Sequence, residues 1–239
     1  MLASTRALLT GILDYAGTFP PASQSLPEAV ANYARVSSCA DRWLLGRLVV
    51  PSHSLREFDG LAGALPVEEN GLWNVSVVLG TRFETRLAEA LALAACQHTT
   101  YRIASLEFPP LGASEMRDLS RSVPNTIETF FEVPVETDFE RCINVIGASG
   151  ALAKVRTGGL TASACPAPEA LVRFLEACSS AGVAFKATAG LHHAVRGCYP
   201  LTYEPGSPTG TMHGFLNVSV AAAIVHTGGR SSEAVTALR

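Results

Sequence analysis

Seven short apolar runs recur along the chain, and their spacing constrains the fold more than any other feature of the sequence. They lie at residues 11–15, 44–50, 74–79, 101–108, 127–133, 151–156 and 183–188. They follow one another at roughly 23 to 34 residues, which suits a repeated strand and helix unit. Because the runs are rich in Val, Leu and Ile, they predict parallel strands covered on both faces. The sequence therefore predicts an α/β fold, a TIM-type (β/α) barrel.

The length and composition favour one domain over residues 1–239. A barrel of this type needs about 250 residues, and this chain has 239. Hydrophobic residues make up 48% and charged residues 16% of the chain, which is enough apolar material for a large core. Within that domain we expect an irregular segment at 196–211 and a helical end that begins with an apolar helix at 213–226.

An eighth strand has no clear place in the sequence. Three alternatives stay open. The strand is hidden in 198–203, or 215–220 is strand instead of helix. The third alternative is an incomplete barrel, which is either open or completed by another chain. We therefore expect a barrel whose eighth strand is in question.

Capping boxes mark where helices should begin, because a Ser or Thr caps the helix and a Glu three residues later reaches back. The pairs are Ser25 with Glu28, Ser54 with Glu57, Thr81 with Glu84, and Thr137 with Glu140. Pro168 and Glu169 predict a further helix that ends at Gly182.

Charge and cysteine usage exclude several classes of protein. The formal net charge of -3 comes without a basic cluster, so we do not expect a nucleic-acid partner. No apolar run approaches the roughly 20 residues that cross a bilayer, so we expect no membrane partner. The six cysteines have no Cys-x-x-Cys spacing, which predicts reduced, buried thiols in a cytoplasmic protein. We expect a homo-oligomer.

Charged residues interrupt the apolar runs near their ends, where a (β/α) barrel places its reacting groups. They are Asp14, Glu107, Glu132, Lys154, Arg156 and Lys186. Lys154 and Arg156 share one face of their strand because side chains alternate. Neighbouring cations and burial favour a neutral amine, which can attack a carbonyl carbon. The pattern thus predicts a Schiff-base lysine, with Glu107, Glu132 or the second lysine as acid and base; the alternative is that these charges form salt bridges at the rim.

Glycine-containing turns follow the sixth and seventh runs and predict a site for an anionic substrate. The first turn has Thr157, Gly158 and Gly159, and the second has Thr188 and Gly190. Glycines let backbone N–H groups approach an anion, so we expect these turns, with Asp14, Arg156 and His192, to bind a small anionic metabolite. The alternative is that the glycines only make tight turns.

No cofactor is expected, and a divalent metal is the alternative. Its ligands would come from Glu107, Glu132, His193 and His213, since imidazole and carboxylate groups are common metal ligands. The competing interpretation is that these histidines are rim residues or an acid–base group.

The two lysine-containing segments resemble motifs of a known enzyme family. Lys154-Val155-Arg156-Thr157-Gly158 and Lys186-Ala187-Thr188-Ala189-Gly190 resemble the paired lysine motifs of deoxyribose-phosphate aldolases over residues 127–191. That resemblance implies a TIM barrel in which Lys154 forms the Schiff base and Lys186 tunes it. The aldolase aspartate on an early strand has no counterpart in 74–79. The whole chain is also similar to uncharacterised bacterial (β/α)-barrel proteins, which implies no activity.

These observations predict a lyase of the aldolase type that acts on a small phosphorylated or carboxylated carbonyl compound. The first alternative is a metal-dependent lyase or isomerase with a Glu and His site. The second is a barrel without catalytic activity that binds a small anion or serves as an assembly subunit.

Overall fold

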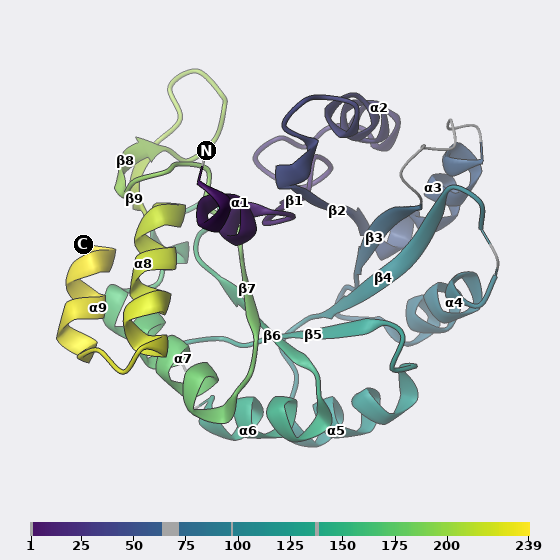
Figure 1. The fold of residues 1–239 in the computed structure, drawn as a ribbon. Helices are drawn as coiled ribbons and strands as arrows, with labels where there is room; N and C mark the ends of the chain where they lie inside the picture. The colour runs from purple at the N-terminus through teal and green to yellow at the C-terminus, as the bar shows by residue number, and fades with distance from the viewer. Residues whose placement is uncertain (1, 64–71, 97, 137–138) are drawn as a thin grey trace. The chain divides into compact units, whose positions relative to one another are not determined.

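All seven predicted strands are present. The structure is a computed structural model that describes residues 2–63, 72–96, 98–136 and 139–239. The strands are β1 (Leu13–Tyr15), β2 (Leu45–Pro51), β3 (Trp73–Val78), β4 (Tyr101–Phe108), β5 (Glu128–Glu132), β6 (Leu152–Arg156) and β7 (Phe185–Thr188). Their order, β1 to β7, follows the chain, as the topology of a (β/α) barrel requires (Figure 1). The mixed α/β class is confirmed.

Helices separate the strands along the chain. The described helices are α1 (Ala3–Leu9), α2 (Leu26–Ser37), α3 (Leu55–Ala62), α4 (Glu84–Ala94), α5 (Ala113–Ser122), α6 (Glu140–Ser149), α7 (Pro168–Ala181), α8 (Phe215–His226) and α9 (Ser231–Leu238). The apolar helix expected at 213–226 is therefore confirmed as α8, whereas α9 carried no prediction.

The helix starts were predicted with mixed success. The Ser25 and Glu28 capping box is confirmed, and the Ser25 hydroxyl lies 2.6 Å from the Glu28 carboxylate. Ser54 precedes α3 but makes no capping hydrogen bond with its side chain. Thr81 is wrong as a cap because Phe83 holds that position before α4. Thr137 lies outside the described residues.

The chain divides into two compact units. The first comprises Met1–Glu107 with Asn125–Glu128, and parallel pairs join β1 to β2, β2 to β3 and β3 to β4. Its core contains fully buried side chains from β2 and β3, such as Val50, Val75 and Val77. In β2, Leu48, Val49 and Val50 are buried in succession, which explains why this strand lacks strict alternation.

The second unit comprises Phe108–Pro124 with Thr129–Arg239, and parallel pairs join β5 to β6 and β6 to β7. Helix α7 buries Leu171, Val172, Phe174, Leu175 and Cys178, one face of a 3.6-residue repeat. It ends where Gly182 takes a φ of +64°, which confirms the predicted stop. Helices α7, α8 and α9 lie side by side in this unit (Figure 1).

No eighth parallel strand occurs in the described part of the chain. The first alternative was partly right, because β8 (Gly197–Pro200) falls near 198–203. However, β8 pairs antiparallel with β9 (Thr209–Met212) in a separate two-stranded sheet. The second alternative was wrong because 215–220 is the start of α8. The segment 196–211 is also less irregular than expected, since it holds β8 and most of β9.

The cysteines are less buried than expected. All six are free thiols, but Cys39, Cys96 and Cys198 are exposed and Cys142 and Cys165 are half-buried; Cys178 is the buried one. The expectation of burial was wrong for the three exposed residues, which lie at a helix end or in a short sheet. No helix in the described ranges is long and apolar enough to cross a membrane.

Candidate active site

Three charged residues of the second unit form a row across adjacent parallel strands. Glu132 at the end of β5 is in register with Lys154 of β6, and Lys154 is in register with Lys186 of β7. Neighbouring strands are about 4.8 Å apart, and residues in register point to the same face. The structure therefore brings together the carboxylate and both lysines that the sequence singled out.

The row is electrostatically asymmetric. Lys154 is 5% exposed, and its Nζ lies 2.9 Å from Oε2 of Glu132 in a largely buried salt bridge. Lys186 is half-buried, and its Nζ lies 5.0 Å from the centre of the Phe130 ring. Phe130 is two residues before Glu132 and thus on the same face of β5. Lys154 forms a salt bridge with a carboxylate, whereas the more accessible Lys186 makes a cation–π contact with an aromatic ring.

The two lysines are the only ones in the sequence. The other 16 of the 18 cationic Lys and Arg residues are arginines. An arginine supplies positive charge as well as a lysine does, but a guanidinium cannot be deprotonated in a protein. A lysine amine can lose its proton and act as a nucleophile. In this arginine-rich chain, the two lysines are thus in-register neighbours on β6 and β7.

Arg156 and Thr188 continue the row toward the carboxyl ends of the strands. They are in register with each other and lie two residues beyond the lysines, on the same faces. Arg156 is exposed, and the Thr188 hydroxyl lies 3.3 Å from the Val155 carbonyl oxygen, to which it donates. A guanidinium at this position can bind an anionic group of a molecule that approaches the lysines.

The two glycine turns pack against each other. A Cβ on Gly158 would lie 2.8 Å from Cα of Gly190, so neither position has room for a side chain. The buried Thr157 hydroxyl donates to the Ala189 carbonyl oxygen at 2.5 Å and fastens one turn to the other. This contact accounts for Gly158 and Gly190 through packing, which is the alternative to an anion cradle. Gly159 is likewise crowded, because its Cβ would lie 2.8 Å from the Ala164 side chain.

Asp14 and Glu107 belong to the first unit, where each has a structural partner. The Arg47 backbone N–H donates to Oδ1 of Asp14 at 2.8 Å, which ties β1 to β2. Glu107 is 2% exposed and accepts a hydrogen bond of 2.7 Å from the Ser76 hydroxyl. Ser76 in turn accepts one of 2.7 Å from Ser105. These contacts place both carboxylates in the sheet of their own unit.

The three histidines that the sequence singled out have separate surroundings. His192 is exposed, although the protein atoms around its ring lower its pKa through partial desolvation, with a smaller effect of His193. The His193 ring stacks on Tyr199 at 3.4 Å between centroids. His213 is 3% exposed and lines a pocket. In the described ranges, no three His, Cys, Asp or Glu side chains form a group that could hold a metal ion.

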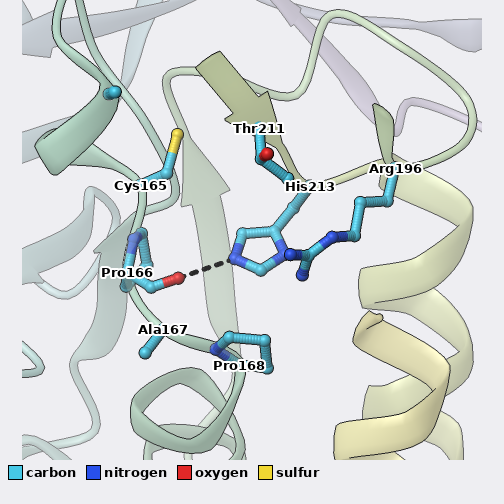
Figure 2. Close-up of a pocket in the computed structure, with 8 residues that line it drawn as sticks. Cys165, Pro166, Ala167, Pro168, Arg196, Thr211 and His213 are labelled. Carbon is cyan, nitrogen blue, oxygen red and sulfur yellow. Dashed lines mark hydrogen bonds between the residues drawn. The ribbon is translucent and has the colours of Figure 1, made fainter. Parts of the chain in front are cut away.

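The pocket beside His213 contains residues that the sequence did not indicate. Its volume is about 290 Å³, and its polar wall is formed by Cys165, Arg196, Thr211 and His213 (Figure 2). Arg196 precedes β8, whereas Cys165 lies just before α7. These positions are distant in sequence and show no motif spacing. The sequence analysis therefore singled out only His213, as a possible metal ligand.

Comparison of the chain with protein-family models, with curated proteins and with solved structures finds no match.

Proposed function

We propose that the protein is a lyase of the aldolase type that forms a Schiff base between Lys186 and a small phosphorylated or carboxylated carbonyl compound. The observation that carries this proposal is the in-register row of Glu132, Lys154 and Lys186, which holds both lysines of the chain. The parallel strands in chain order also support a (β/α) barrel without an eighth parallel strand as its frame.

Lys186 is the better nucleophile of the two because it is the more accessible. Lys154 is almost fully buried and ion-paired with Glu132, so a substrate carbonyl reaches it less readily. This choice reverses the roles that the aldolase resemblance implies. It leaves Lys154, ion-paired with Glu132, as a proton donor beside the reacting amine.

The proposed reaction balances with the two lysines and water. The neutral Lys186 amine attacks the carbonyl carbon, a C–N bond forms, and the carbonyl oxygen leaves as water after it takes up protons. Lys154, held by Glu132, is the proton donor within the row, and solvent restores its proton. The resulting iminium accepts the electron pair of the C–C bond that breaks, while water takes the proton of the β-hydroxyl group and that fragment leaves as a carbonyl product. The enamine left on Lys186 takes a proton from Lys154, and water hydrolyses the iminium that forms, which releases the second product and the amine. Arg156 binds the anionic group of the substrate.

Trapping with borohydride tests the proposal. The protein is incubated in turn with glyceraldehyde 3-phosphate, pyruvate and acetaldehyde, and the intact mass is measured after reduction. We expect one adduct on wild-type protein, its loss in Lys186→Arg, and slower formation in Lys154→Arg. Both changes keep the positive charge and remove only the amine.

The double variant Lys154→Arg with Lys186→Arg is the matched control. It contains no lysine, so any remaining adduct reports the N-terminal amine. An adduct yield on wild-type protein equal to that of the lysine-free protein would exclude the Schiff base. An adduct that persists in Lys186→Arg and disappears in Lys154→Arg would assign the amine to Lys154.

A further inference from the structure

The pocket beside His213 combines a cation with a buried imidazole nitrogen in a small volume. It lies wholly in the second unit, between the turn before α7, the start of α7, and the ends of β8 and β9. Figure 2 shows the Arg196 guanidinium next to the His213 ring, with Thr211 and Cys165 on the same side of the pocket. None of its residues belongs to the lysine row.

The Pro166 carbonyl fixes the tautomer of His213. Nε2 of His213 lies 2.8 Å from the Pro166 carbonyl oxygen, and a carbonyl oxygen only accepts hydrogen bonds. Nε2 therefore carries the proton, and Nδ1 of the neutral ring presents a lone pair. Burial first, and then the positive charge of Arg196, lower the pKa of His213, so the neutral ring is favoured at neutral pH.

Nδ1 of His213 has no hydrogen-bond partner among the described residues. The Leu238 carbonyl oxygen is near enough to interact with the ring, but it is also an acceptor. A buried acceptor without a donor destabilises the folded protein. A ligand that donates a hydrogen bond to Nδ1 would remove that cost.

Arg196 offers donors next to this lone pair. Its backbone N–H donates to Asn217 at 2.8 Å, and one guanidinium N–H donates to the Leu238 carbonyl at 2.9 Å. A guanidinium has five N–H donors in all. No carboxylate of the described residues lies within ion-pair distance of Arg196, although its charge influences Glu169. The half-buried cation can therefore bind an external anion.

The remaining walls suit a small organic acid. Ala167, the N-cap residue of α7, and Pro168, the first residue of this 14-residue helix, line the pocket and bring the positive end of the helix dipole to it. Burial raises the pKa of the Cys165 thiol, which keeps it neutral beside a bound anion. The volume of about 290 Å³ is at the small end of ligand sites and fits a molecule of a few carbon atoms.

From this geometry we infer that the pocket binds a small 2-hydroxy carboxylic acid, with the carboxylate on Arg196 and the hydroxyl donating to Nδ1 of His213. A simple carboxylate or a sulfate ion offers acceptors only, so neither satisfies the lone pair. Nδ1 is shielded from solvent, so a neighbouring side chain must move for the hydroxyl to reach it. Within the described ranges, the Arg196 guanidinium makes one side-chain hydrogen bond, to the Leu238 carbonyl oxygen, and is therefore a side chain that can turn. Binding at this pocket is independent of the lysine chemistry.

Calorimetric titration with glycolate, acetate and sulfate tests the site at neutral pH. Glycolate differs from acetate by one hydroxyl, and one added hydrogen bond is worth roughly a three- to tenfold gain in affinity. We expect glycolate to bind tighter than acetate by that factor and sulfate to bind more weakly than glycolate. We expect Arg196→Gln to lose at least tenfold in affinity for both carboxylates.

Arg239→Gln is the matched control because it removes the same charge beside the start of α7, where Arg239 pairs with Glu169. It should bind glycolate like the wild type. His213→Phe should bind both carboxylates equally. If His213→Phe does not fold, the ¹⁵N shift of Nδ1 in wild-type protein gives the same answer, since glycolate should move it and acetate should not.

Four results would overturn the inference: no binding of glycolate to folded protein, tighter binding of sulfate than of glycolate, an unchanged preference for glycolate in His213→Phe, or an unmoved Nδ1 signal at saturating glycolate. The lysine-free double variant should bind glycolate normally. Its result separates failure of this site from failure of the proposed Schiff base.

Discussion

Lys154 is a buried cation, and its tolerance within the sheet depends on Glu132. Their side chains are 6% and 14% exposed, so water screens the pair only weakly. The pair of Arg47 with Glu128 has exposures of 23% and 50% and lies in a more aqueous setting. Removal of one partner should therefore lower the free energy of unfolding by different amounts in the two ion pairs.

Glu132→Gln should destabilise the protein by about 3 kcal/mol, because it leaves the Lys154 charge buried without its acid. Urea unfolding followed by circular dichroism measures this change. The control Glu128→Gln should cost less than about 1 kcal/mol. Replacing the buried pair together, as Glu132→Leu with Lys154→Met, should destabilise less than Glu132→Gln alone; a larger loss would contradict this interpretation.

The pKa of His213 predicts how stability varies with pH. The folded pKa lies below the ordinary value of 6.5, so near and below pH 6.5 the unfolded chain binds a proton that the folded chain does not. Stability should therefore fall as the pH drops from 7.5 to 5.5. The His213→Phe protein should show a smaller loss between these two pH values.

Urea unfolding at both pH values checks this prediction. The His192→Gln protein separates the contribution of His192, whose pKa is also lowered. An equal loss of stability in wild-type and His213→Phe protein would show that His213 does not contribute.

At the scale of elements, the turns after β6 and β7 behave as one packed unit. Gly158 and Gly190 meet backbone to backbone, and the Thr157 hydroxyl joins the two turns. The turns lie directly after the strands that carry Lys154 and Lys186. Their packing should therefore hold the ends of the lysine row in place.

Gly190→Ala should destabilise the protein by clearly more than Gly206→Ala. Both glycines have a positive φ, +76° and +78°, so both substitutions strain the backbone. A Cβ at residue 190 would also lie 2.7 Å from Cα of Gly158, whereas at residue 206 it meets nothing within 4 Å. Gly206→Ala should cost about 1 kcal/mol. Equal costs in thermal unfolding would show that the close approach of the turns is unimportant.

At the scale of the whole molecule, the six free thiols should differ in reactivity according to burial. Burial raises the pKa of Cys178 to about 12, while Cys39, Cys96 and Cys198 are exposed. A thiol reagent acts on the thiolate, so Cys178 should react only when α7 leaves its packing. Mass spectrometry of folded protein at pH 8 should find the exposed three labelled first, and early labelling of Cys178 would contradict this order.

The strands were predicted well because burial leaves a local signature in sequence. Short runs of Val, Leu and Ile separated by capped helices located β1 to β7, and β4 matched its predicted bounds of 101–108. The capping boxes were less reliable, since Phe83 and not Thr81 precedes α4. A cap depends on the exact chain direction at the helix entry, which tertiary contacts set.

The sequence by itself determined where the seven parallel strands lie and the alternation that puts Lys154 with Arg156 on one face, but it left an eighth strand open. Tertiary structure decided which strands are in register, and so made neighbours of Glu132, Lys154 and Lys186. It also decided the antiparallel pairing of β8 and the pocket of Cys165, Arg196 and His213. Periodicity follows from local burial, whereas contacts between distant loops depend on packing that no local pattern encodes.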